Sequence, residues 1–89
     1  MNTKWLKNKI SIDEAEREYL VEDELLGPEP VPFGFQFEEW SALKGQFQEE
    51  DELWEFSSPF ETWENLGGTA GICIVRDGEV VDSIVTMMN

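Results

Sequence analysis

The clearest pattern of hydrophobic and polar positions lies near the C-terminal end of the chain. Residues 71–76 (GICIVR) and 79–86 (EVVDSIVT) are rich in β-branched side chains, and Asp77-Gly78 separates them. An Asp-Gly pair between two such segments favours the two-residue type I′ turn, whose twist matches that of the flanking strands. We therefore predict a β-hairpin over residues 71–86.

A two-residue turn also predicts which residues of the hairpin face each other. Counting outward from Arg76 and Glu79 places Cys73 opposite Asp82. One face then carries Ile72, Ile74, Val81 and Val85, and the other carries Cys73, Val75, Val80 and Ile84. A sheet packed on one side only should have one polar face. Either helices cover both faces of the hairpin, or one face meets a partner or a second copy of the chain. We favour one layer of helices with partial cover of the other face by aromatic side chains, and a homodimer is the alternative.

A helix over residues 12–25 is predicted by its start signal and by its apolar spacing. Ser11 and Glu14 have the spacing of a capping box, and apolar residues follow at helical steps. Gly27-Pro28 should end this helix. Residues 27–34 contain alternating prolines, which favour an extended connector between two helices.

Two further helices and one strand are expected in the middle of the chain. Aromatic residues recur at helical steps over about residues 37–44, after an extended lead-in. Residues 53–57 alternate as a strand does. Ser58 and Pro59 are suited to the N-cap and first position of a short helix, and Gly67-Gly68 should end it.

Together these elements predict a single α+β domain spanning residues 1–89. The strand at 53–57 should join the C-terminal hairpin in a three-stranded antiparallel sheet, which packs against two to three short helices. A chain of 89 residues has room for one such domain. Residues 1–10 form a basic N-terminal segment with three lysines and no acid, and the pattern assigns no element to them.

The charge of the chain narrows the classes of partner. The formal net charge is −14, from 20 acidic and 6 basic residues. Such a surface repels nucleic-acid phosphates and anionic lipids, whereas it attracts basic protein surfaces and speeds encounter with them. We therefore expect a basic protein partner, with no direct binding to nucleic acid or membrane.

The cysteine content and the first residues indicate a cytoplasmic protein. Cys73 is the only cysteine, so no disulfide can form within the chain, as is usual in a reducing compartment. Residues 1–10 contain lysines but are not followed by the apolar segment of a signal peptide.

The acidic residues occur in short clusters, of which residues 48–56 (QEEDELWEF) contain the densest. Four consecutive acids repel one another and are tolerated where water solvates them, so we predict a loop at about 45–52. The strand that follows should anchor this loop through Trp54 and Phe56. We predict that the residues of these clusters bind the partner, namely Glu22, Asp23, Glu24, Glu38, Glu39, Glu49, Glu50, Asp51 and Glu52.

Catalytic and metal chemistry find little support in the sequence. The chain has no histidine, so neither a Ser-His nor a Cys-His pair can form. Cys73 should be a core residue, and Asp82 is the one acid that we expect to be partly buried. The acids at 49–52 lack the spacing of a calcium loop, and a zinc site needs more ligands than one cysteine. We expect no cofactor, no metal site and no enzymatic activity.

These observations favour a non-enzymatic, acidic protein-binding module of the inhibitor, immunity-protein or adaptor type. Its acidic clusters would engage a basic protein surface. The alternative is a small structural homo-oligomer that assembles through the C-terminal hairpin, in which the acids serve solubility only.

Overall fold

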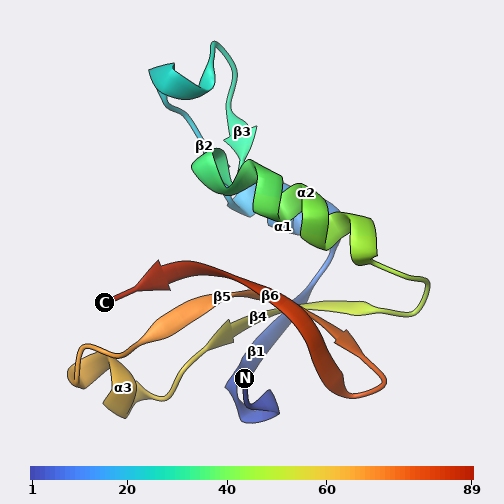
Figure 1. Ribbon diagram of the computed structural model, residues 1–89, viewed down its shortest axis with the longest axis vertical. Coiled ribbons are helices and arrows are strands. Elements are labelled where there is room, and N and C mark those ends of the chain that lie inside the picture. Colours follow the sequence, from blue (N-terminus) through green and yellow to red (C-terminus); the bar gives the residue numbers. More distant parts are fainter.

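Four antiparallel strands form the main sheet of the computed structural model, which describes residues 1–89 (Figure 1). In sheet order they are β1 (Leu6–Ile10), β4 (Glu52–Ser57), β5 (Thr69–Arg76) and β6 (Glu79–Met88). The α+β class, the C-terminal hairpin and the strand beside it are confirmed. The predicted three-stranded sheet is one strand too small, because the basic N-terminal segment supplies β1.

Strand β1 escaped prediction because it is a polar edge strand. Its sequence is LKNKI, and only Leu6 and Ile10 at its ends are half-buried. Leu6 pairs with Phe56 and Ile10 pairs with Leu53 of β4. Lysines on an edge strand discourage pairing with a further chain. The three-residue turn η1 (Thr3–Trp5) precedes it.

Helix α1 (Ile12–Glu18) begins at the predicted capping box but ends earlier than expected. The Ser11 hydroxyl accepts a hydrogen bond from the Glu14 amide at 3.0 Å, and the Glu14 carboxylate accepts one from the Ser11 amide at 3.0 Å. The predicted extension to residue 25 is wrong, because the chain turns at Tyr19. There the Tyr19 carbonyl accepts a hydrogen bond from the Phe33 amide at 2.7 Å.

A second, two-stranded sheet replaces the predicted end of that helix. It consists of β2 (Leu20–Val21) and β3 (Val31–Pro32), with the turn η2 (Glu24–Leu26) between them. We call residues 20–32 the acidic arm. Figure 1 shows this arm extending beyond the helices, away from the main sheet. The residues predicted as a plain connector therefore form one side of the arm and the turn η3 (Gly34–Gln36).

The two remaining helices occur close to where they were predicted. Helix α2 (Phe37–Gln46) runs two residues beyond the expected end, and helix α3 (Phe60–Glu64) follows Pro59. Pro59 rather than Ser58 is the N-cap of α3. The Ser58 hydroxyl is used elsewhere, because it accepts a hydrogen bond from the Thr69 amide at 2.9 Å. None of the helices has the length and apolar character needed to cross a membrane.

The hairpin turn is confirmed, but the register predicted beyond it is wrong by one residue. Asp77 and Gly78 both have positive φ, 52° and 80°, as a type I′ turn requires. Strand β6 then bulges at Val81, so that Ile74 pairs with Asp82 and Cys73 pairs with Ser83. A bulge inserts one unpaired residue and reverses the facing of every residue after it.

The bulge exchanges residues between the two faces of the hairpin. Ile84 joins the core beneath the helices, and Val85 moves to the opposite face. The predicted composition of both faces is therefore wrong for these two residues and for Asp82. Asp82 is exposed, lies opposite Ile74 rather than Cys73, and accepts a hydrogen bond from Gln46 of α2 at 2.6 Å.

The main core lies between the sheet and helices α1 and α2, which Figure 1 shows on the same side of the sheet. Its buried side chains are Ala15, Phe33, Trp40, Leu43, Leu53, Ile72, Ile74 and Ile84. On the opposite face, Phe56, Cys73 and Val75 form a smaller cluster beneath Trp5, Leu6, Trp54, Val80 and Val85. This agrees with the expected combination of one helical layer and aromatic cover.

Candidate functional site

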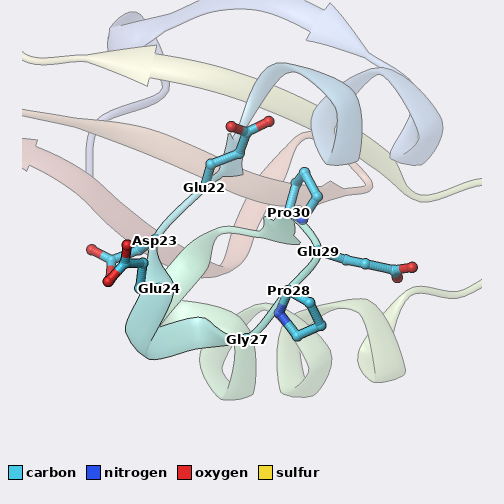
Figure 2. A pocket seen from close by; sticks show the side chains of 7 residues that line it. All are labelled: Glu22, Asp23, Glu24, Gly27, Pro28, Glu29 and Pro30. Atoms are coloured by element: carbon cyan, nitrogen blue, oxygen red, sulfur yellow. The ribbon is translucent and has the colours of Figure 1, made fainter.

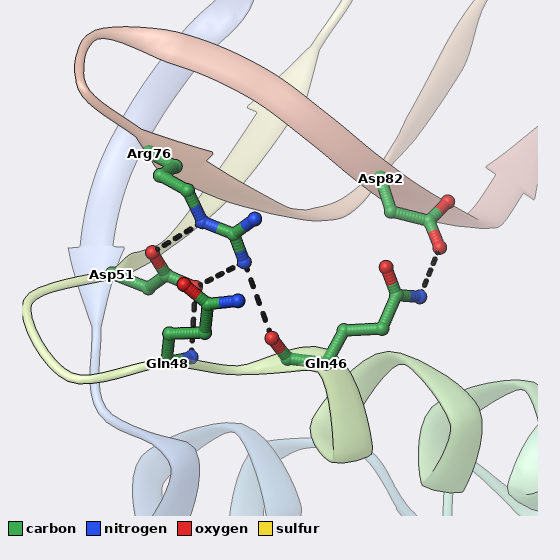
Figure 3. Close-up of polar contacts among 5 residues, drawn as sticks. All are labelled: Gln46, Gln48, Asp51, Arg76 and Asp82. Atoms are coloured by element: carbon green, nitrogen blue, oxygen red, sulfur yellow. Dashed lines mark hydrogen bonds and ion pairs between the residues drawn. The ribbon is translucent and has the colours of Figure 1, made fainter.

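Asp51, one of the predicted partner-binding residues, is committed to an internal ion pair. Its carboxylate oxygens accept hydrogen bonds from Nε and Nη2 of Arg76 at 2.9 and 2.8 Å (Figure 3). Nη2 of Arg76 also donates to the Gln46 carbonyl at 3.2 Å. Only 2% of the Asp51 side chain is exposed. The hydrogen bonds from Arg76 lower the pKa of Asp51, and Asp51 therefore fastens the loop after α2 to the sheet.

Glu52 is also neutralised within the chain. It accepts hydrogen bonds from Nε1 of Trp54 at 2.9 Å and from Nζ of Lys9 at 3.1 Å, and these two contacts lower its pKa. Glu49 and Glu50 are exposed, and their side chains make no hydrogen bond or ion pair. The run of four acids is therefore divided. Its second half holds the loop to strands β1 and β5, and its first half is free.

The ion pair of Asp51 predicts a pH-dependent difference between the protein and its Arg76→Gln variant. Because Arg76 lowers the pKa of Asp51 in the folded protein, the stability that it provides is present above the unfolded pKa of about 4 and is lost as pH falls. We expect the variant to have a lower free energy of unfolding at neutral pH, and the difference to shrink below about pH 4. Urea unfolding at several pH values, followed by tryptophan fluorescence, measures both.

Arg17→Gln is the matched control, because it removes the same charge and Arg17 belongs to none of the ion pairs. Its difference from the unmodified protein should show no comparable fall below pH 4. A difference for Arg76→Gln that is as large at about pH 2 as at neutral pH would contradict the role of Asp51.

The predicted cluster Glu22, Asp23 and Glu24 lies on the acidic arm together with Glu29. These acids surround a shallow depression with Gly27, Pro28 and Pro30, and all are exposed. Asp23 accepts a hydrogen bond from the Leu25 amide at 2.9 Å, which caps η2. Figure 2 shows the carboxylate of Glu29 on the opposite side of the arm from those of Asp23 and Glu24. The carboxylates thus present charge outward and do not converge on one point.

Glu38 and Glu39 lie in the first turn of α2, where the helix dipole stabilises acidic side chains. Both are exposed, and neither makes a side-chain hydrogen bond or ion pair. Glu38 lies near the acidic arm, because it lines the same groove as Leu26 and Pro30 of the arm. The acids at 49–50 follow the other end of α2.

This groove between the acidic arm and the start of α2 was not predicted. We call it the apolar groove, and it is lined by Leu26, Pro30, Val31, Pro32, Gly34, Phe35, Phe37 and Glu38. Its volume is about 570 Å³. Phe35 and Phe37 are 68% and 46% exposed, so two large aromatic side chains of the groove face solvent. The alternation FGFQF was a signal, but it was interpreted as an extended lead-in to the helix.

The remaining candidate groups, the cysteine thiol and the acidic clusters, do not have the surroundings of a reactive or metal-binding site. Cys73 is fully buried in β5, and burial raises the pKa of its thiol to about 11, so the thiol is protonated at neutral pH. No group of three or more acidic or cysteine side chains has the arrangement of a metal site. Neither the acidic depression nor the apolar groove is lined by a lysine or arginine.

No family model, curated protein or solved structure matches this chain. The functional argument therefore rests on the arm, the groove and the charges around them.

Proposed function

We propose that this protein is a non-enzymatic protein-binding module of the inhibitor, immunity-protein or adaptor type, which engages a basic protein surface through its acidic arm and helix α2. One observation carries the proposal. Three acids elsewhere in the fold, Asp51, Glu52 and Glu16, form ion pairs with Arg76, Lys9 and Lys44, whereas the acids of the arm and the start of α2 have no cationic partner in the chain, and most of them border the apolar groove or the acidic depression.

Unpaired acids held close together repel one another, and a bound cationic surface would relieve that repulsion. The arm and α2 are ordered elements, so binding does not require a flexible tail to be fixed in place. Among the predicted residues, we assign the main contacts to Glu22, Asp23, Glu24, Glu38 and Glu39. Glu49 and Glu50 extend the same charge along the molecule, and Asp51 and Glu52 maintain the fold.

Neutralising the arm should weaken binding to the partner. The variant Glu22→Gln, Asp23→Asn, Glu24→Gln, Glu29→Gln is expected to bind roughly 10- to 100-fold more weakly, because exposed charge pairs each contribute up to about 1 kcal/mol. The partner is first captured from a lysate of the source cell at about 50 mM salt and released at about 500 mM. Its dissociation constant for each purified variant is then measured by titration calorimetry.

A control variant with the same charge change separates a site from a general effect of charge. Glu61→Gln, Glu64→Gln, Asp77→Asn, Glu79→Gln alters four exposed acids outside the arm. The control should bind within about threefold of the unmodified protein, since surface substitutions away from a contact have small effects. Equal weakening by both variants would show that net charge alone matters and would contradict the assignment to the arm.

Assembly of copies of this chain through the C-terminal hairpin is a second candidate. It is favoured by the face of the sheet opposite α1 and α2, which these two helices leave uncovered (Figure 1). Val80 and Val85 are half-buried there. However, a net charge of −14 opposes the association of identical chains, so we place this candidate second. A molar mass of 10.3 kDa in solution at every concentration would exclude it.

A further inference from the structure

The aromatic side chains of the apolar groove lie outside the buried core. The buried core includes Phe33 but neither Phe35 nor Phe37. Five of the eleven exposed large apolar side chains lie between residues 20 and 37, namely Leu20, Val21, Leu25, Phe35 and Phe37. Of these five, Phe35 and Phe37 line the apolar groove, and neighbouring exposed aromatic side chains bordered by polar residues are typical of an interaction site.

The groove is built on a rigid base. Phe33 stacks between Tyr19 and Trp40, with ring centroids 4.8 and 4.5 Å away, and it directly precedes the groove residue Gly34. Gly34 has a φ of 55° and packs so closely on Val21 that an added Cβ would lie 2.9 Å from that side chain. The groove residues are therefore held in place by the core before any partner arrives, which lowers the entropic cost of binding.

The charge around the groove selects the kind of occupant. Pro30 lines both the apolar groove and the acidic depression of Glu22, Asp23, Glu24 and Glu29, and Glu38 lies on the α2 side of the groove. An occupant must therefore present apolar side chains with cationic groups beside them. Nucleic acid and anionic lipid are repelled by these acids. A second copy of this chain is repelled as well, because it carries the same net charge of −14.

The backbone at the groove also selects the form of the occupant. An extended peptide binds a strand by pairing with its free amide and carbonyl groups. Strand β3 is only Val31–Pro32, and Pro30 and Pro32 have no amide hydrogen to donate. A helix satisfies its own backbone hydrogen bonds and can place apolar side chains in a groove without such pairing. Phe35 and Phe37 are so exposed that a small molecule bound against them would keep much of its own surface in contact with water.

From these observations we propose that the apolar groove binds an amphipathic, basic helix of the partner protein. Apolar residues at positions i, i+3 or i+4, and i+7 of that helix contact Phe35, Phe37 and Leu26, and its lysines or arginines lie against the acidic arm and Glu38. This assignment rests on the proposed function, because it names the segment of the basic partner that is recognised.

The proposal is tested with two synthetic peptides of about 18 residues made of leucine, lysine and alanine, long enough to form a helix of several turns. One places its leucines on a single helical face, and the other has the same composition with the leucines dispersed around the helix. Fluorescence anisotropy of labelled peptide measures binding to the full chain. We expect the first peptide to bind at least tenfold more tightly than the second.

The groove variant Phe35→Ser, Phe37→Ser should lose that tenfold preference, and the control Phe60→Ser, Leu66→Ser should retain it. All four side chains are exposed, so neither variant should change the thermal unfolding temperature markedly. Equal binding of the two peptides, or a preference that survives in the groove variant, overturns the groove assignment while leaving the acidic arm as a binding surface. A dimeric mass that the groove variant alone abolishes also overturns it, because the occupant is then a second copy.

Discussion

Replacing Trp40 by alanine is expected to lower the free energy of unfolding by about 3–5 kcal/mol, the range found for removing a large buried aromatic side chain. Trp40 is 1% exposed, and its ring stacks on Phe33 with centroids 4.5 Å apart. Its Nε1 donates a hydrogen bond to Glu16 at 2.9 Å, which also lowers the pKa of Glu16. Because small domains have only about 5–15 kcal/mol of stability in total, this variant should lose a large fraction of its stability and unfold at a much lower urea concentration.

Urea unfolding followed by circular dichroism measures this effect. Trp40→Phe is the informative comparison, because it keeps most of the ring but cannot donate to Glu16. Its loss should lie well below that of Trp40→Ala. If Trp40→Ala lowers the free energy of unfolding by less than about 1 kcal/mol, the effect is typical of a surface residue. That result would contradict the burial of Trp40 in the core.

Replacing Gly71 by alanine should lower the free energy of unfolding by a similar amount. The cause is the opposite one, because the added methyl group has no space, whereas Trp40→Ala leaves a cavity. A Cβ at Gly71 would lie 1.9 Å from the Ile84 carbonyl oxygen and 3.0 Å from Cα of Val85. Both are backbone atoms of β6, so the strand itself must move. Overpacking of a core typically costs 1–3 kcal/mol and sometimes more, and we expect about 3 kcal/mol here because no side chain can yield.

Gly45→Ala is the matched control for this substitution. Gly45 lies within α2, and an added Cβ would meet nothing within 4 Å. Since alanine favours a helix over glycine by about 1 kcal/mol, this control should stabilise the protein slightly. Thermal unfolding of both variants by circular dichroism gives the comparison. An equal, small effect at the two positions would contradict the close contact of β5 and β6.

The close contact at Gly71 also bears on the candidate site. Just beyond it, the Val85 carbonyl of β6 accepts a hydrogen bond at 2.7 Å from Gln36. Gln36 immediately precedes α2 and lies between the groove residues Phe35 and Phe37. The position of the apolar groove relative to the sheet thus depends on the path of β6. A change at Gly71 should therefore disturb the groove as well as the fold.

Local signals in the sequence predicted those elements whose geometry is set by neighbouring residues. The capping box of Ser11 and Glu14 correctly located the start of α1, and Asp77-Gly78 correctly located the hairpin turn. In both cases the hydrogen bonds or dihedral angles that matter lie within a few residues. The end of α1 could not be predicted in this way, because it depends on the contact between Tyr19 and Phe33 across the acidic arm.

Pairing between distant segments decided the size and register of the sheet. Strand β1 has a weak pattern of its own and is a strand because Leu6 and Ile10 pair with β4. The bulge at Val81 is likewise invisible in the sequence, which contains no glycine or proline there. It places Ile84 in the main core and Val85 on the face of the smaller cluster, so packing against the helices and the aromatic cover, not the local pattern, selects the register.

The sequence by itself determined the amount of charge, the α+β class and the absence of histidine chemistry, since composition and local pattern suffice for these. Only the tertiary structure decided which acids remain free. Asp51 meets Arg76, Glu52 meets Lys9 and Glu16 meets Lys44 across separations of 25, 43 and 28 residues. Coulomb energy depends on distance in space, and folding alone brings these charges together. The same folding leaves the arm acids unpaired and places an apolar groove beside them.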